Sequence, residues 1–71
     1  MIRWYVQGLV WTLSFYPSGN PVDAAAAKIA SAFAVSDVKL WPTEDARIYR
    51  VQWFNHETDT FHEDFVRIYP H

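Results

Sequence analysis

The stretch 1–16, MIRWYVQGLVWTLSFY, decides the fold because it alternates apolar and polar residues and then changes phase at Gly8. The side chains of a strand alternate between two faces, so a shift of one residue sends the second apolar set to the opposite face unless the chain turns or bulges. Either event at Gly8 determines how the sheet begins. The apolar residues are even-numbered before Gly8 and odd-numbered after it: Ile2, Trp4 and Val6, then Leu9, Trp11, Leu13 and Phe15.

Two structures explain this change of phase. One is a hairpin that turns at Gln7-Gly8, and the other is a single long strand with a bulge at Gly8. The long strand would extend about 45 Å, whereas a globule of this size is only about 28 Å across. The hairpin is therefore favoured. It places six apolar side chains on one face of the sheet, beneath the single helix. The facing pairs are Val6 and Leu9, Trp4 and Trp11, and Ile2 and Leu13.

The segment after this hairpin predicts a helix that begins at Asn20 and ends near Ala34. Asn20 can cap the free backbone N–H groups, and Pro21 suits the first helical position. Asp23 complements the positive end of the helix dipole, and the run Ala24 to Ala27 has the highest helix propensity available. The apolar stripe expected to face the sheet consists of Val22, Ala26, Ile29 and Phe33.

The remaining sequence predicts three strands, over 37–41, 47–54 and 60–69, with turns at 43–45 and 55–59. The last two strands form a hairpin. The expected fold is α+β, with one helix packed on one face of a four- or five-stranded antiparallel sheet. The element order is ββαβββ, or βαβββ if Gly8 is a bulge.

Composition limits the class of protein. The 71 residues make one domain, and thirteen aromatic residues (Trp 4, Tyr 4, Phe 5) supply packing in a chain without cysteine. There is no apolar run of the roughly 20 residues that a membrane span needs, and no signal-peptide pattern. We therefore expect a protein in the cytoplasm that does not contact membranes.

One helix can cover only one face of the sheet, yet apolar residues occur on both faces of several strands. The surplus predicts an exposed aromatic surface that meets a partner. A cluster of four acids, within eight residues that hold no Lys or Arg, is expected to select that partner by charge. The predicted partner-binding residues are Tyr5, Trp41, Ile48, Arg50, Phe54, Glu57, Asp59, Glu63 and Asp64.

Chemical sites are not indicated. His56 and His62 lie six residues apart across a turn, and a His-Glu-x-x-His motif would need a second His at Thr60 or Val66. Cysteine, a Gly-x-Ser-x-Gly elbow and a phosphate-binding glycine loop are all absent from the sequence. We therefore expect no catalytic residue, no metal site and no cofactor.

Two further functions stay open beside a protein-binding module. Aromatic strands could stack unpaired bases of single-stranded nucleic acid, with Arg50 as one basic contact. The net charge of −2 and the lack of a basic run in the sequence count against this function. A structural homodimer would instead bury the aromatic surface against a second copy.

The run from Asn20 onward resembles small anti-CRISPR proteins of bacteriophages. It places Ala27-Lys28-Ile29-Ala30-Ser31 in a helix that is followed by a short strand and a final hairpin. The resemblance covers about fifty residues and carries over no functional residue. It implies a compact inhibitor that acts in the cytoplasm of a bacterial host and occupies a surface of a nucleoprotein complex. The acidic cluster would then compete for basic surfaces of that complex.

Overall fold

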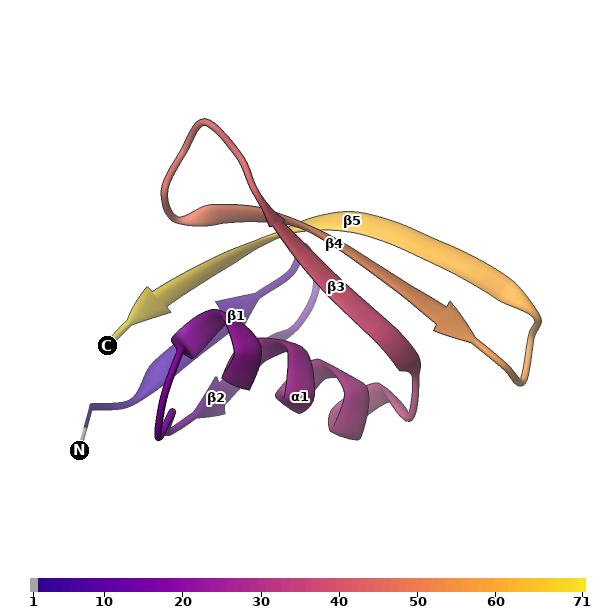
Figure 1. Ribbon diagram of the computed structural model, residues 1–71, viewed down its shortest axis with the longest axis horizontal. Helices are drawn as coiled ribbons and strands as arrows, with labels where there is room; N and C mark the ends of the chain where they lie inside the picture. Colours follow the sequence, from indigo (N-terminus) through magenta and orange to yellow (C-terminus); the bar gives the residue numbers. More distant parts are fainter. Residues whose placement is uncertain (1) are drawn as a thin grey trace.

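The computed structural model describes residues 2–71 as one helix and a five-stranded antiparallel sheet. The strand order across the sheet is β2-β1-β5-β4-β3 (Figure 1). This confirms the predicted α+β class and the order ββαβββ, with a hairpin rather than a bulge at Gly8. The elements are β1 (Trp4–Gln7), β2 (Thr12–Phe15), α1 (Pro21–Phe33), β3 (Ser36–Pro42), β4 (Ile48–Asn55) and β5 (Thr60–Pro70).

The first hairpin has a longer loop than the sequence predicts, so the predicted register is wrong. Trp4 pairs with Phe15 and Val6 pairs with Leu13, which leaves the loop 8–11 between the strands. The predicted pairs are displaced by four residues. An even displacement keeps every side chain on its predicted face, but it moves Leu9 into the loop, where it is 88% exposed. Ile2 precedes β1 and is also exposed rather than covered by the helix.

The helix begins as the sequence predicts. The Asn20 side chain accepts a hydrogen bond from the Val22 N–H at 2.8 Å, and Pro21 is the first helical residue. Ala34 ends the helix in the left-handed conformation, with φ of 53°. The buried helix residues are Ala25 and Ile29, so the buried stripe is rotated from the predicted one. The sheet curls around the helix, and α1 contacts β1, β2, β3 and β5.

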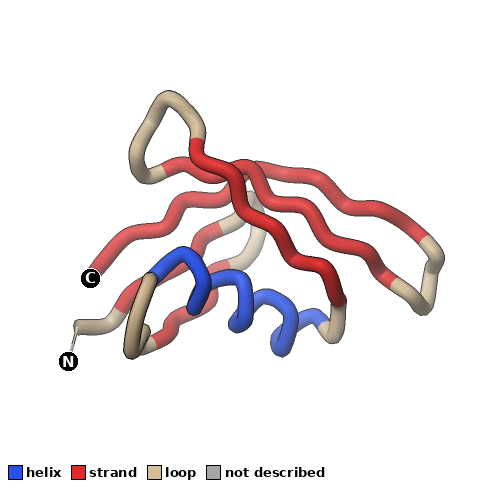
Figure 2. The backbone as a smooth tube through the Cα atoms, viewed as in Figure 1, coloured by secondary structure: helices blue, strands red, loops and turns tan. Residues whose placement is uncertain are grey.

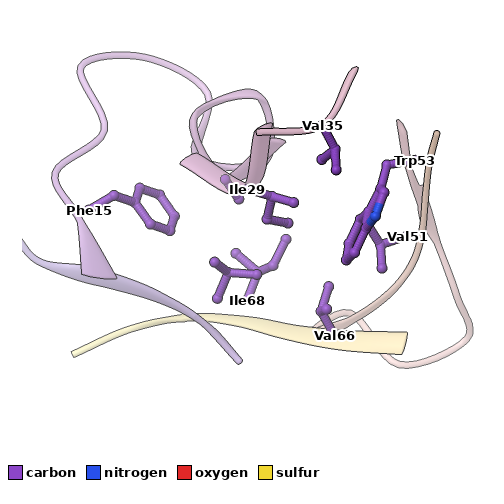
Figure 3. Packing of buried hydrophobic residues seen from close by; sticks show 9 residues of the cluster. Phe15, Ile29, Val35, Val51, Trp53, Val66 and Ile68 are labelled. Atoms are coloured by element: carbon purple, nitrogen blue, oxygen red, sulfur yellow. The ribbon is translucent and has the colours of Figure 1, made fainter. Parts of the chain in front are cut away.

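The core lies between the helix and the concave face of the sheet. Ile29 points from the helix toward Ile68 of β5, and Val51 and Trp53 of β4 close one end (Figure 3). Phe15 of β2 fills the opposite end. The nine buried apolar residues are Val6, Phe15, Ala25, Ile29, Val35, Val51, Trp53, Val66 and Ile68.

An aromatic stack extends this core toward the β4–β5 turn. The Trp11 ring contacts Phe33 edge-on, with centroids 5.1 Å apart, and Phe33 stacks on Trp53 at 5.6 Å. Trp53 stacks in turn on His62 of β5 at 4.2 Å. The first loop, the end of the helix and the central hairpin are thus connected through one continuous set of rings.

Candidate binding surface on the outer sheet face

The face of the sheet that points away from the helix has no covering element among residues 2–71 (Figure 2). Residues that pair directly across antiparallel strands share a face. The pairs Trp41 with Arg50 and Arg50 with Phe65 therefore place three neighbouring strands in one surface. We call this surface the outer face; its residues are Tyr5, Gln7, Lys39, Trp41, Ile48, Arg50, Gln52, Phe54, Phe61, Glu63, Phe65, Arg67 and Tyr69.

Two phenylalanines of β5 are the most exposed aromatic residues of the outer face. Phe61 is 64% exposed and Phe65 is 58% exposed. Phe61 pairs with Phe54 of β4, and Phe65 pairs with Arg50. Burial of a phenylalanine stabilises a complex by roughly 1.5–3 kcal/mol relative to leaving it in water. These two side chains are the most exposed large apolar residues of the sheet.

A network of polar contacts lies beside them. The Arg50 guanidinium lies over the Trp41 ring, 4.8 Å from its centroid. Arg50 Nη1 is also 3.9 Å from Glu63 Oε2, and Gln52 donates a hydrogen bond to the same carboxylate oxygen. Exposed contacts of this kind stabilise a fold by about 1 kcal/mol or less. They hold the Arg50 and Trp41 side chains against each other on the outer face and contribute little to the stability of the domain.

The β1 end of the outer face is also aromatic. The Tyr5 ring lies 5.5 Å from the Tyr69 ring and 5.7 Å from the His71 ring. Beside it, Arg3 Nε donates a hydrogen bond of 3.0 Å to the Tyr16 hydroxyl. That hydrogen bond raises the pKa of Arg3 above its ordinary value, and the guanidinium, which stays charged in proteins, lies at the margin of the outer face.

Folding gathers cations from separate strands on the outer face. Of the six Lys and Arg residues, Lys39, Arg50 and Arg67 lie on the outer face and Arg3 lies at its margin. The acids Glu57 and Asp59 lie in the β4–β5 turn, at one end of the sheet. The outer face is therefore more basic than the net charge of −2 indicates.

The structure distributes the nine predicted partner-binding residues over three places. The outer face holds Tyr5, Trp41, Ile48, Arg50, Phe54 and Glu63, while the turn holds Glu57 and Asp59. Asp64 pairs with Val51 and lies on the helix side, half-buried. The predicted residues omit seven members of the outer face, namely Gln7, Lys39, Gln52, Phe61, Phe65, Arg67 and Tyr69.

Buried polar side chains and clusters of metal-ligating side chains are absent from the part of the chain that the structure describes. Within residues 2–71 no charged or polar residue is buried, and no group of three His, Asp or Glu side chains could hold a metal ion. The same residues include no helix that is long and apolar enough to cross a membrane. Searches of protein-family models, of curated proteins and of solved structures each found no significant match to this chain.

Proposed function

We propose that this chain is a non-catalytic module that binds a protein partner through its outer face. One observation carries the proposal. Phe61 and Phe65 are exposed on either side of Glu63, on a sheet face that no other element of residues 2–71 covers, and Phe65 lies opposite Arg50 of the Arg50–Trp41 pair. Monomeric domains rarely expose contiguous apolar surface unless a partner covers it.

The composition of the outer face supports a protein partner. The cores of protein interfaces are enriched in Tyr, Trp, Phe and Arg, which are the residue types with the largest binding energies. Tyr5, Trp41, Arg50 and Phe65 supply one of each on this face. Together with Glu57 and Asp59 in the turn, they give an aromatic centre with an acidic end.

In its most concrete form the module is an inhibitor that occupies a surface of a bacterial nucleoprotein complex. The layout of one helix on an antiparallel sheet, which resembles that of small anti-CRISPR proteins, supports this form. The acidic turn supports it as well, because carboxylates compete with nucleic acid for basic surfaces.

The first test is affinity capture from bacterial lysate with variants of the outer face. We expect Phe65→Ser and Trp41→Ser to lose the captured partner, because each removes an apolar anchor of the outer face, Phe65 on the central strand β5 and Trp41 on the edge strand β3. Val10→Ser is the matched control, since Val10 is 88% exposed in the first loop and lies outside the outer face. Equal capture by all four proteins would contradict the proposal. Light scattering would show whether the lost partner is a second copy of the chain.

A second candidate is a sheet that binds single-stranded nucleic acid. The specific observation in its favour is that Lys39, Arg50 and Arg67 share the outer face with its aromatic rings. Cations that neutralise phosphates and rings that stack bases are the two components of such sites.

Labelled oligonucleotides separate the two candidates by their response to salt. If the second candidate holds, fluorescence anisotropy shows binding that weakens steeply as salt rises, because phosphate contacts release counterions. Arg50→Gln and Arg67→Gln should each lower the salt slope by about one. Lys28→Gln, which changes the helix instead, should leave the slope unchanged. Absence of binding at low salt would exclude this candidate.

A further inference from the structure

Half of β5 has a neighbouring strand on one side only. β4 pairs with β5 from Thr60 to Arg67, whereas β1 pairs only with the segment from Arg67 to Pro70. Figure 1 shows the first half of β5 continuing beyond β1, toward the β4–β5 turn. We call Thr60–Val66 the free segment. No strand of residues 2–71 pairs with its second side, which we call the open side, although Gly8 and Leu9 of the first loop line a hollow beside Asp64, Phe65 and Val66.

Two hydrogen bonds show which backbone groups of the free segment point to the open side. The Ile68 N–H donates to the Arg47 carbonyl, toward β4, and the His71 N–H donates to the Arg3 carbonyl, toward β1. Backbone groups alternate in direction along a strand. The N–H and C=O groups of the odd-numbered residues Phe61, Glu63 and Phe65 therefore point to the open side.

One of these backbone groups already has a hydrogen-bond partner within the chain. The Asp64 carboxylate accepts a hydrogen bond from the Phe65 N–H at 2.8 Å. The N–H groups of Phe61 and Glu63 have no hydrogen-bond partner among residues 2–71. An unpaired row of backbone groups is a template for an added strand.

The other two open sides of the sheet suit an added strand less well. β2 has four residues. β3 is interrupted by a register shift between Ser36 and Lys39, where Asp37 has a φ of 56°, and it ends at Pro42. Bulges, prolines and short length all discourage pairing at the edge of a sheet. The free segment of β5 is regular and pairs with β4 without interruption.

We propose that the free segment binds an extended basic peptide segment of the partner as an added antiparallel strand. Charge identifies this occupant. Glu57, Asp59, Glu63 and Asp64 lie in or next to the free segment, and only one of these four carboxylates, that of Glu63, contacts an arginine of residues 2–71, namely Arg50. The inference rests on the proposed function, because it names the chemistry of the protein partner.

A second copy of this chain is a poor occupant by the same criterion. Antiparallel pairing of two free segments brings Glu63 and Asp64 of one copy close to Glu63 and Asp64 of the other. Like charges that face each other across strands are destabilising. An added strand whose lysines lie on the outer face instead places a cation opposite Glu63, and the apolar stems of the lysines on either side cover Phe61 and Phe65.

The test uses the whole isotope-labelled protein and a short synthetic peptide in which lysine and valine alternate. We expect the NMR signals of the Phe61 and Glu63 amides to shift on titration, and their hydrogen exchange to slow, because they donate to the added strand. A peptide with glutamate in place of each lysine, and one with alternate amides N-methylated, should bind at least roughly tenfold more weakly. Equal binding by either of these peptides would overturn the inference.

Matched variants separate the added strand from a contact elsewhere. Glu63→Lys should weaken the lysine–valine peptide roughly tenfold, whereas Glu44→Lys makes the same charge change in the loop between β3 and β4 and should leave affinity unchanged. No binding, or shifts confined to Tyr5 and Trp41, would overturn the inference. The proposed function would survive either result, since capture of a partner by the outer face is measured separately.

Discussion

Replacement of Ile29 by alanine will remove most of the stability of this domain. Ile29 is completely buried, and its side chain fills the space between the helix and the sheet. Ile→Ala changes at such sites cost about 2–5 kcal/mol, from lost burial and from the cavity left behind. A domain of this size has a free energy of unfolding of only about 4–10 kcal/mol. A large fraction of the Ile29→Ala protein should therefore be unfolded.

The effect is large at Ile29 because the helix has few other anchors. Ala25 is the only other fully buried helix residue, and Phe33 at the helix end is 37% exposed. The alanine-rich helix approaches the sheet closely but contributes little apolar area apart from this residue. A cavity here cannot be filled by a neighbouring large side chain of the same helix.

Urea unfolding followed by tryptophan fluorescence and circular dichroism measures this loss. Ile29→Val is the control, with an expected cost of about 0.5–1.5 kcal/mol because one methylene is removed. A cost below about 1 kcal/mol for Ile29→Ala, with an unchanged slope against urea, would show that the helix does not depend on this contact.

Local signals were sufficient to predict the helix. Asn20, Pro21 and Asp23 act within one turn of the chain, and each occupies the position that its chemistry predicts. The alternation around Gly8 likewise predicted a hairpin and the faces of Trp4, Val6 and Leu13 correctly. Alternation determines only which face of the sheet each side chain lies on, however. Registers that differ by an even number of residues keep the same faces, so alternation cannot distinguish between them. The loop 8–11 carries no strong turn signal that could select one displacement.

The outer face depends on a loop length that the sequence leaves undetermined. A five-residue loop over 55–59 would place Phe54 opposite Thr60, and the odd-numbered phenylalanines of β5 would then face the helix. In the structure Asn55 pairs with Thr60, so Phe54 lies opposite Phe61. A change of one residue in the length of this turn therefore decides whether Phe61 and Phe65 are exposed and whether Asp64 lies on the helix side.

The open side of β5 could not be predicted from neighbouring residues. It arises because β5 lies between β1 and β4, two strands that are far apart in the sequence. β1 is four residues long and β5 is eleven, so part of β5 has no second neighbour. Strand order of this kind depends on packing of the whole sheet around the helix.

Substitution of Gly8 by alanine is expected to destabilise the domain by about 1–3 kcal/mol, which is the usual cost of overpacking. A Cβ atom at Gly8 would lie 2.6 Å from Trp11 Nε1 and 2.7 Å from Trp11 Cζ2. The φ angle of Gly8 is not positive, so the backbone alone would accept alanine. The glycine is required because the Trp11 ring occupies the space of a side chain.

The Trp11 ring cannot move away freely, because it packs against Phe33, which stacks on Trp53. Thermal unfolding should show the cost, and near-ultraviolet circular dichroism should show the displaced tryptophan. Gly19→Ala is the matched control, since a Cβ there meets nothing within 4 Å and should change stability by less than about 1 kcal/mol.

A double-mutant cycle identifies the cause of the Gly8→Ala effect. If the Trp11 ring is the obstacle, Gly8→Ala should cost almost nothing in a Trp11→Ala background, and the two substitutions should be strongly non-additive. Additive costs would instead assign the requirement for glycine to the backbone of the loop. The phase change at Gly8 would then reflect turn geometry alone, whereas the contact with Trp11 connects it to the aromatic stack that reaches His62 on β5.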